Sequence, residues 1–390
     1  YGMVLTYPFF SFGGLYVTGS LIGWLIFGMA TLRWYANQQD KDAFIPAIVW
    51  LWIASGVVLL ITLLIAHINW DLGLTKTIKS TIGWAKGWAL MPLFLLLGAT
   101  VKIKPELMVR AACIIATHSL VFAVFSVALY IVGAPADLFT SPLKALGGPG
   151  PDFFKVSLYG LNPETGAGRW RFFAPWAPAA GFMACILLIF CSQEKEKFWR
   201  NTGILGSLIM CLLSQSRAGL VIFLMLIFLL MFLGKIKNPL GLIIFGVAIC
   251  CFFLIAEYIY DLLNTAYLDI KAARPESSRV RSALASIALQ RWETEAPIWG
   301  HGIVEKGPHI VAYMPIGSHH SWYGLLFVKG IVGMLAVAIP MAITAFYLVF
   351  QSHKNAMSRT AFCMILVFIC YSFFENLEIL AYIYWPALLW

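Results

Sequence analysis

Two adjacent histidines, His319 and His320, stand where a long polar segment gives way to a long apolar one. The polar segment runs from about 257 to 318 and the apolar one from 322 to 350. This position predicts imidazoles at the boundary between a membrane helix and water, with a pKa near the reference value of about 6.5. A neutral imidazole there could act as a general base on a hydroxyl group. The alternative is that both rings only cap the helix or face lipid headgroups.

Arginines form the second group of candidates. Six of them lie in segments that we expect on the outer side of a membrane, where basic residues are normally depleted: Arg169, Arg171, Arg217, Arg279, Arg281 and Arg291. A guanidinium stays charged and binds phosphate oxygens with two donors at once, which suits a diphosphate held at a membrane surface. Arg217 is the most constrained, because an unpaired charge between two apolar spans costs about 2.5 kcal/mol or more.

Each arginine also has a simpler interpretation. Arg217 could reach lipid phosphates as an anchor. The arginines of the 257–318 segment could pair with acids that are close in sequence, namely Glu276, Glu293 and Glu295.

Metal-ligand patterns are weak in this sequence. The acids of the outer segments include no Asp-x-Asp pair, and Glu293 and Glu295 could chelate an ion only if their loop folded back onto the site. The eight cysteines all lie in apolar runs, which is typical of small core residues and not of a zinc site or a disulfide framework. We therefore expect neither a metal nor another cofactor.

Composition assigns the chain to the membrane class. Its 390 residues are 61% hydrophobic and 12% charged, against roughly 25% charged in soluble domains. The formal net charge of +9 suits anionic lipid surfaces and phosphate-bearing substrates, and nothing in it indicates nucleic acid. We expect an all-α integral membrane protein, a bundle of about 11 to 12 transmembrane helices of about 20 residues each.

The apolar runs divide this single membrane domain. They are expected at about 9–32, 43–66, 82–101, 107–132, 177–192, 203–216, 218–234, 239–256, 322–350, 360–374 and 377–390. The resulting order is transmembrane helices in 1–132, an irregular loop rich in Gly and Pro at 133–176, helices in 177–256, a large loop at 257–318, and helices in 319–390.

Orientation follows from two short basic connections, 194–200 and 234–239, which are typical of the cytoplasmic side. Counting crossings from them puts the 133–176 loop, the 214–217 corner and the 257–318 loop together on the periplasmic side. Within the last of these, the apolar residues 284, 287 and 288 share one face at helical spacing, which predicts a short amphipathic helix packed on the bundle.

Three motifs now resemble a known family. Ser-Gln-Ser-Arg-Ala-Gly at 214–219, Pro-Ile-Trp-Gly-His-Gly at 297–302 and His-His-Ser-Trp-Tyr…Lys-Gly-Ile-Val-Gly at 319–333 are similar, in order and spacing, to signatures of the O-antigen ligase/polymerase superfamily. A weaker similarity begins at Arg169. The sequence departs from the family at His320 and Trp176, where the family often has Asn.

The resemblance implies a GT-C type glycosyltransferase. The lack of an Asp-x-Asp pair predicts that it works without a metal, and direct displacement by the acceptor would invert the anomeric centre. The resemblance also implies His319 as the catalytic base, and Arg217 with either Arg279 or Arg281 as ligands of the donor diphosphate. From their positions in the outer segments we expect His320, Arg291, Arg171 and Arg169 as supporting residues. The donor would be O-antigen linked to undecaprenyl diphosphate, and the acceptor lipid A–core, at the periplasmic face of a bacterial inner membrane and among its lipids.

Two other functions stay open at this point. A polymerase or a protein O-oligosaccharyltransferase of the same superfamily would differ in its acceptor. A transporter or flippase for lipid-linked glycans would use the same arginines for binding only.

Overall fold

The computed structural model describes residues 15–36, 45–101, 103–146, 148, 150–162, 166–233, 275–311, 313–352 and 354–389. The predicted span at 239–256, the basic connection at 234–239 and residues 257–274 of the predicted large loop lie outside the described residues. Within the described residues the chain is mainly helical, with two short pairs of strands.

The bounds of the helices match most of the predicted spans. The helices are α2 (Leu15–Ala36), α3 (Ala47–Asn69), α4 (Leu74–Lys86), α5 (Leu90–Thr100), α6 (Pro105–Ile131), α7 (Ala177–Cys191), α8 (Lys197–Ser214), α9 (Arg217–Leu233), α12 (Pro275–Glu295), α13 (Ser321–Gln351), α14 (Ala356–Ser372) and α15 (Leu377–Tyr384). Four helical stretches of the described chain are long and apolar enough to cross a membrane, at 47–69, 74–100, 105–131 and 321–351. The all-α membrane class is thereby confirmed, while the total of 11 to 12 spans stays a prediction.

Two helices differ from the expected segments. The run at 82–101 is not one helix, because α4 ends at Lys86 and α5 begins at Leu90. A Cβ atom on Gly87 would lie 2.5 Å from Cγ of Glu378, so only glycine lets the chain break and pass α15 at this point. In addition, α8 begins at Lys197, six residues before the predicted start, inside the basic connection.

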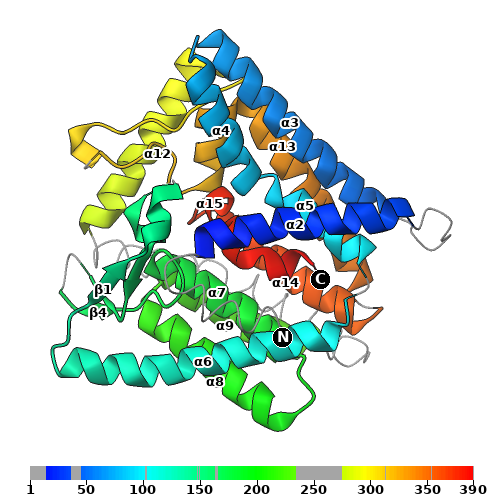
Figure 1. The fold of residues 1–390 in the computed structure, drawn as a ribbon, viewed down its shortest axis with the longest axis vertical. Coiled ribbons are helices and arrows are strands. Elements are labelled where there is room, and N and C mark those ends of the chain that lie inside the picture. Colours follow the sequence, from blue (N-terminus) through cyan, green and yellow to red (C-terminus); the bar gives the residue numbers. More distant parts are fainter. Residues whose placement is uncertain are drawn as a thin grey trace, which may run out of the picture.

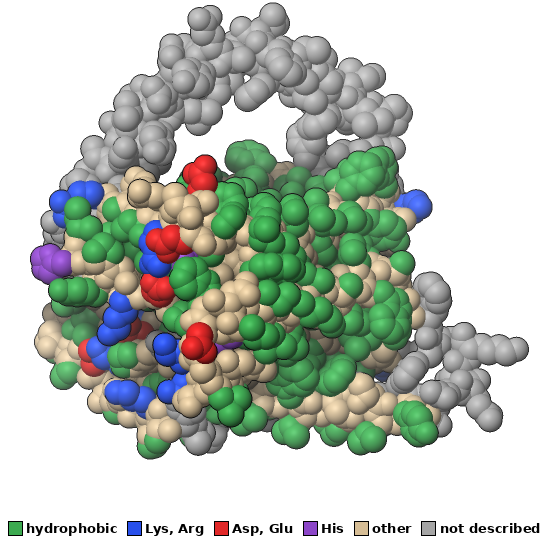
Figure 2. Space-filling model, turned by 90° about the horizontal axis from the view of Figure 1, so that it is seen from above, with side chains coloured by type: hydrophobic (Ala, Val, Ile, Leu, Met, Phe, Trp, Pro, Cys, Tyr) green, Lys and Arg blue, Asp and Glu red, His purple; other side chains and the backbone are tan. Residues whose placement is uncertain are grey.

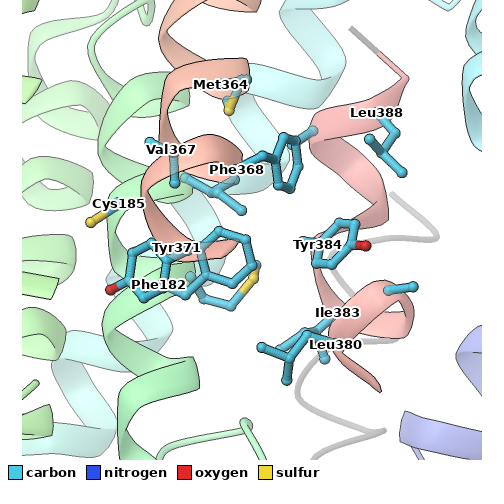
Figure 3. Packing of buried hydrophobic residues seen from close by; sticks show 14 of the residues in the cluster. Phe182, Cys185, Met364, Val367, Phe368, Tyr371, Leu380, Ile383, Tyr384 and Leu388 are labelled. Atoms are coloured by element: carbon cyan, nitrogen blue, oxygen red, sulfur yellow. The ribbon is translucent and has the colours of Figure 1, made fainter. Parts of the chain in front are cut away.

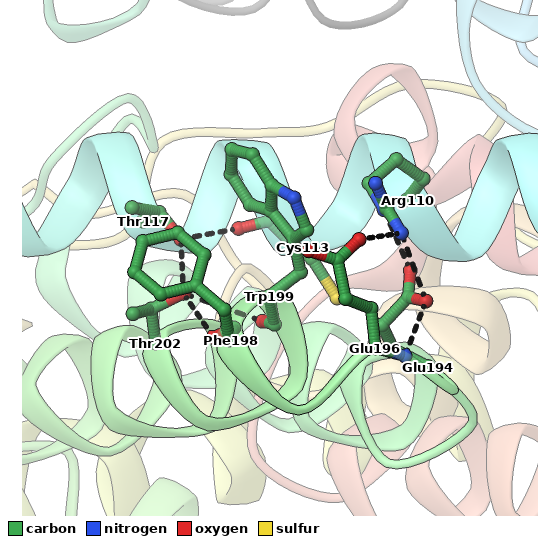
Figure 4. Close-up of polar contacts among 8 residues, drawn as sticks. All are labelled: Arg110, Cys113, Thr117, Glu194, Glu196, Phe198, Trp199 and Thr202. Atoms are coloured by element: carbon green, nitrogen blue, oxygen red, sulfur yellow. Dashed lines mark hydrogen bonds and ion pairs between the residues drawn. The ribbon is translucent and has the colours of Figure 1, made fainter.

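The early start of α8 has an electrostatic reason. Arg110 of α6 donates from Nε to Oε2 of Glu194 at 2.8 Å and from a terminal nitrogen to Oε2 of Glu196, also at 2.8 Å. Its guanidinium also lies over the ring of Trp199, 5.5 Å from the centroid. Figure 4 shows this cluster holding the α7–α8 corner against α6, with the hydroxyls of Thr117 and Thr202 bonded about two turns of α6 further along. The corner is thus fixed, and the helix continues directly from it.

The centre of the bundle is formed by α7, α14 and α15. Nearly every residue of α7 is buried. Aromatic rings fill the space between these helices: Phe182 lies 4.5 Å from Tyr371, and Phe368 lies 4.9 Å from Tyr384, between ring centroids (Figure 3). Around this core, α13 packs along α3 and α14, and α6 packs along α8 and α7 (Figure 1).

The predicted irregular loop at 133–176 is confirmed as non-helical in its larger part, with small strands that the sequence did not indicate. β1 (Asp137–Thr140) pairs antiparallel with β2 (Lys155–Ser157), and β3 (Gly160–Leu161) pairs with β4 (Gly168–Arg169). Short 3-10 turns lie at Pro142–Leu146 and Pro151–Phe153.

The outer segments meet at one end of the bundle. The backbone N–H of Trp170 donates to the carbonyl of Leu213 at 3.0 Å, and the amide of Gln215 donates to the carbonyl of Gly168 at 2.8 Å. The predicted amphipathic helix is α12, longer than expected, with Leu284 and Ala288 buried. Figure 2 shows charged side chains gathered at one side of the molecule, beside a broad apolar surface. The side of the membrane that this end faces stays a prediction.

Candidate functional site

A cavity of about 1160 Å³ opens where these segments converge. Its walls come from the 150–153 and 169–178 parts of the outer loop, from α12, from residues 304–319, and from α2, α4, α13 and α15. Charged or titratable side chains occur on several of these walls: Lys86, Asp152, Arg169, Arg281, His319, Lys329, Glu375 and Glu378. The sequence predicted three of them, Arg169, Arg281 and His319, as site residues.

His319 lies in the cavity wall, two residues before α13. Its Nε2 atom is 3.4 Å from the sulfur of Met314. Burial, with a smaller contribution from the positive charge of Arg281, lowers the pKa of His319 to about 4. The expectation of a pKa near 6.5 was therefore wrong, because segments distant in sequence cover this corner and remove it from water. The imidazole is neutral at pH 7, the form that accepts a proton.

A buried carboxylate faces Arg281. Glu375 lies between α14 and α15, 2% exposed, and its Oε1 atom is 4.0 Å from a terminal nitrogen of Arg281. Trp176 donates from Nε1 to Oε2 of Glu375 at 2.8 Å. Burial raises the pKa of Glu375 to about 7, while Arg281, the bond from Trp176 and Arg169 act in the opposite direction.

The backbone of Glu375 is tied to the start of α13. The hydroxyl of Ser321 donates to the carbonyl of Glu375 at 2.7 Å and accepts from the backbone N–H of Leu377 at 3.0 Å. These bonds hold the corner that carries His319 at a fixed place beside the carboxylate.

The two arginines of the 169 and 217 regions have different positions. Arg169 lines the cavity, and its Nε atom donates to the carbonyl of Ser214 at 3.1 Å. Arg217 is the first residue of α9, next to that corner, and is not among the described residues that line the cavity. Arg169 thus lines the same cavity as His319, whereas Arg217 does not.

The two candidate arginines of α12 have different positions. Arg281 lines the cavity, whereas Arg279 is exposed and is not among the lining residues. Two residues of helix turn the side chain by about 200°, so only one of these arginines can face the cavity.

Three predicted supporting residues have other partners. Arg171 donates to the carbonyls of Asp152, Lys155 and Pro175 and to the hydroxyl of Ser157, which holds the outer loop together. Arg291 forms an ion pair with Glu295 at 2.8 Å, as the acid-pairing interpretation proposed, and a second one with Glu305 at 2.6 Å, which that interpretation did not include. His320 accepts at Nδ1 from the backbone N–H of Tyr323 at 3.4 Å, as the capping interpretation proposed. Catalytic support by these three stays a prediction.

The Pro-Ile-Trp-Gly-His-Gly turn has a structural function. α13 is broken at Gly330, where φ is +66°, and a Cβ atom there would lie 2.1 Å from the carbonyl oxygen of Ile298. The backbone N–H groups of His301 and Gly302 donate to the carbonyls of Phe327 and Val328 at 2.8 and 2.9 Å. The turn therefore provides the hydrogen bonds that the broken helix lacks.

Glu375, Glu378 and Lys329 were missed by the sequence reasoning. All three are ionisable residues in strongly apolar stretches, a pattern that is by itself a functional signal in a membrane protein. Trp176 was noted only as a departure from a motif, and its role as the partner of Glu375 depends on a contact across 199 residues. Among the described residues, no group of three or more His, Cys, Asp or Glu is placed to hold a metal ion.

Comparison with known proteins identifies one family. Residues 202–338 match the family model described as O-antigen ligase, and no curated protein matches the chain. The matched segment covers about a third of the 390 residues and includes Arg217, Arg281 and His319, whereas Arg169, Trp176 and Glu375 lie outside it. The segment that carries the histidine corner, the α12 arginines and the turn that holds α13 belongs to the O-antigen ligase superfamily.

Proposed function

We propose that the protein is an O-antigen ligase, which transfers O-antigen polysaccharide from undecaprenyl diphosphate to lipid A–core at the periplasmic face of a bacterial inner membrane. The observation that carries this proposal is the meeting of His319, Arg281 and Arg169 on one cavity of about 1160 Å³ beside the helices. The family match supports the reaction class, and the apolar helices support a membrane-bound substrate.

His319 is the general base in this proposal. As the acceptor hydroxyl attacks the anomeric carbon, its proton passes to the neutral imidazole, and the bond between that carbon and the diphosphate oxygen breaks. Attack from the side opposite the leaving group inverts the anomeric centre. The products are the glycosylated acceptor, undecaprenyl diphosphate and an imidazolium that must lose its proton before the next turnover.

Arg281 and Arg169 bind the leaving diphosphate. Negative charge grows on the diphosphate as the bond breaks, and two guanidinium groups stabilise it without a metal ion. The bound diphosphate also offsets the positive charge of Arg281 near His319, so donor binding raises the pKa of the base toward a more effective value. We keep Arg217 as a further ligand of the lipid-linked donor, because it lies in the 214–217 corner, where the carbonyl of Ser214 accepts a hydrogen bond from Arg169.

The test of this function combines a strain and a purified protein. Deletion of the gene is expected to give free lipid A–core together with accumulated lipid-linked polymer. Single-unit caps on the core would instead indicate a polymerase, and accumulation at the cytoplasmic face would indicate a flippase.

Substitution then tests the base. His319→Ala in the purified protein is expected to lower transfer by about 10² to 10⁴ while donor binding stays near that of the wild type. His320→Asn is the matched control, because this neighbour does not line the cavity, and it should keep most activity. Transfer by His319→Ala at the wild-type rate would refute the proposed mechanism.

A further inference from the structure

The inner wall of the cavity carries a charged cluster that the proposed mechanism does not use. It consists of Lys329 on α13, Glu378 on α15 and Lys86 at the end of α4, all of which line the cavity. Lys329 is 3% exposed. A lysine buried to this degree is rare unless its charge has a partner or a function.

The position of Lys329 is fixed by the break in α13. It directly precedes Gly330, and the backbone N–H of Ile331 donates to the carbonyl of Pro297 at 2.9 Å. A Cβ atom on Gly300 would lie 2.5 Å from the backbone nitrogen of Lys329, so the external turn packs directly on this peptide. The ammonium is therefore presented by a rigid part of the backbone.

Glu378 provides only part of the balancing charge. It interacts electrostatically with Lys329, yet the described residues form no hydrogen bond or ion pair within 4.0 Å with the ammonium of Lys329. Lys86 adds a second cation on the same wall, 5.5 Å from the ring centroid of Tyr16. Two cations thus face the cavity there against one carboxylate, and the ammonium of Lys329 retains donors for a ligand.

This cluster is separate from the arginine site. Lys329 follows Ser321 by eight residues, which is about 12 Å along a helix. The cavity therefore has cations on two parts of its wall: Arg169 and Arg281 on the outer loop and α12, and Lys329 with Lys86 on α13 and α4.

We propose that Lys329, with Glu378 as its counter-ion, forms a second anion subsite that binds a phosphate or carboxylate group of one of the two substrates. This inference rests on the proposed function only in taking those substrates to be lipid-linked and lipid-anchored saccharides. Its chemistry is that of a buried ammonium, which donates up to three hydrogen bonds to an anion.

The experiment measures binding by the full chain in nanodiscs, using glucose 6-phosphate and farnesyl diphosphate as probes and glucose as the uncharged reference. The key variant is the double substitution Lys329→Gln/Glu378→Gln, which removes both charges and leaves no buried ion unpaired. Its thermal unfolding should match that of the wild type. Lys155→Gln is the control, since that lysine pairs with Asp137 on the outer loop.

The double variant is expected to bind at least one anionic probe more weakly by a factor of about ten or more, because the charge-assisted hydrogen bond from Lys329 is lost. The single variant Glu378→Gln should bind that probe more tightly than the wild type, because the carboxylate that competes with the probe for the ammonium of Lys329 is removed. Weakening confined to glucose 6-phosphate assigns the subsite to a saccharide anion, and weakening of farnesyl diphosphate assigns it to the donor.

Wild-type affinity of the double variant for both probes would overturn the proposal and leave Lys329 and Glu378 as a structural ion pair. None of these measurements needs glycosyl transfer. They therefore remain interpretable even if His319→Ala keeps its activity and the proposed function fails.

Discussion

The pH dependence of transfer tests the role of His319 directly. The neutral imidazole is the active form, so activity is lost as the pH falls through the pKa of the histidine. Burial and the charge of Arg281 lower that pKa from 6.5 to about 4. The difference corresponds to about 3 kcal/mol in favour of the neutral ring, at about 1.4 kcal/mol for each pH unit.

Activity at about pH 5.5 distinguishes a pKa of 6.5 from a pKa of about 4 for His319. A histidine with a pKa of 6.5 would be about one-tenth neutral at this pH, whereas one with a pKa of about 4 stays almost wholly neutral. Because kcat/KM reports the free enzyme, its acid limb should fall near pH 4. The limb of kcat should lie at higher pH, since the bound diphosphate opposes the effect of Arg281.

The assay is initial-rate transfer from a radiolabelled lipid-linked donor between about pH 4 and 8. Arg281→Gln should move the acid limb of kcat/KM to higher pH, because the positive charge that lowers the pKa of His319 is removed. The move should be smaller than the part of the pKa shift caused by burial, since burial is the larger cause. Glu375→Gln is the necessary control, since the pKa of that carboxyl is about 7, and the limb near pH 4 should survive in it. A kcat/KM limb at pH 6 to 7 that Glu375→Gln leaves in place would refute the assignment of His319 as a buried base.

Three further outcomes are expected. Transfer should persist in excess EDTA, and a loss of activity that Mg²⁺ or Mn²⁺ restores would contradict the metal-free mechanism and direct attention to Glu293 and Glu295. Arg281→Lys should lower kcat/KM by about tenfold or more and weaken competition by undecaprenyl diphosphate, because a point charge replaces the two-donor guanidinium. Arg279→Lys should behave as wild type. Equal effects of the two substitutions would refute the choice of Arg281 over Arg279. Gly330→Ala should destabilise the protein by about 3 kcal/mol or more in thermal unfolding, because φ is +66° and the new Cβ atom meets the carbonyl of Ile298, whereas Gly28→Ala, with no atom within 4 Å of its Cβ position, should not.

The sequence by itself determined the class of the protein, most of its helices and the position of the catalytic candidate. Hydropathy fixes these features because a span must satisfy its own backbone and bury about 20 apolar residues, which is a local property of the chain. The same locality explains why α3, α6, α7, α9 and α13 begin within a few residues of the predicted points. It also explains why His319 could be placed at the end of a helix without any structure.

Only the tertiary structure decided which charges act together. Arg281 was distinguished from Arg279 by the face of α12 that packs on α13, and Glu375 entered the site through contacts with Trp176 and Arg281 from distant segments. The pKa of His319 was mispredicted for the same reason, because burial depends on what covers a residue. Hydropathy describes each segment alone, whereas a cavity is the space left between segments, so the charges on its walls are known only when the segments are packed.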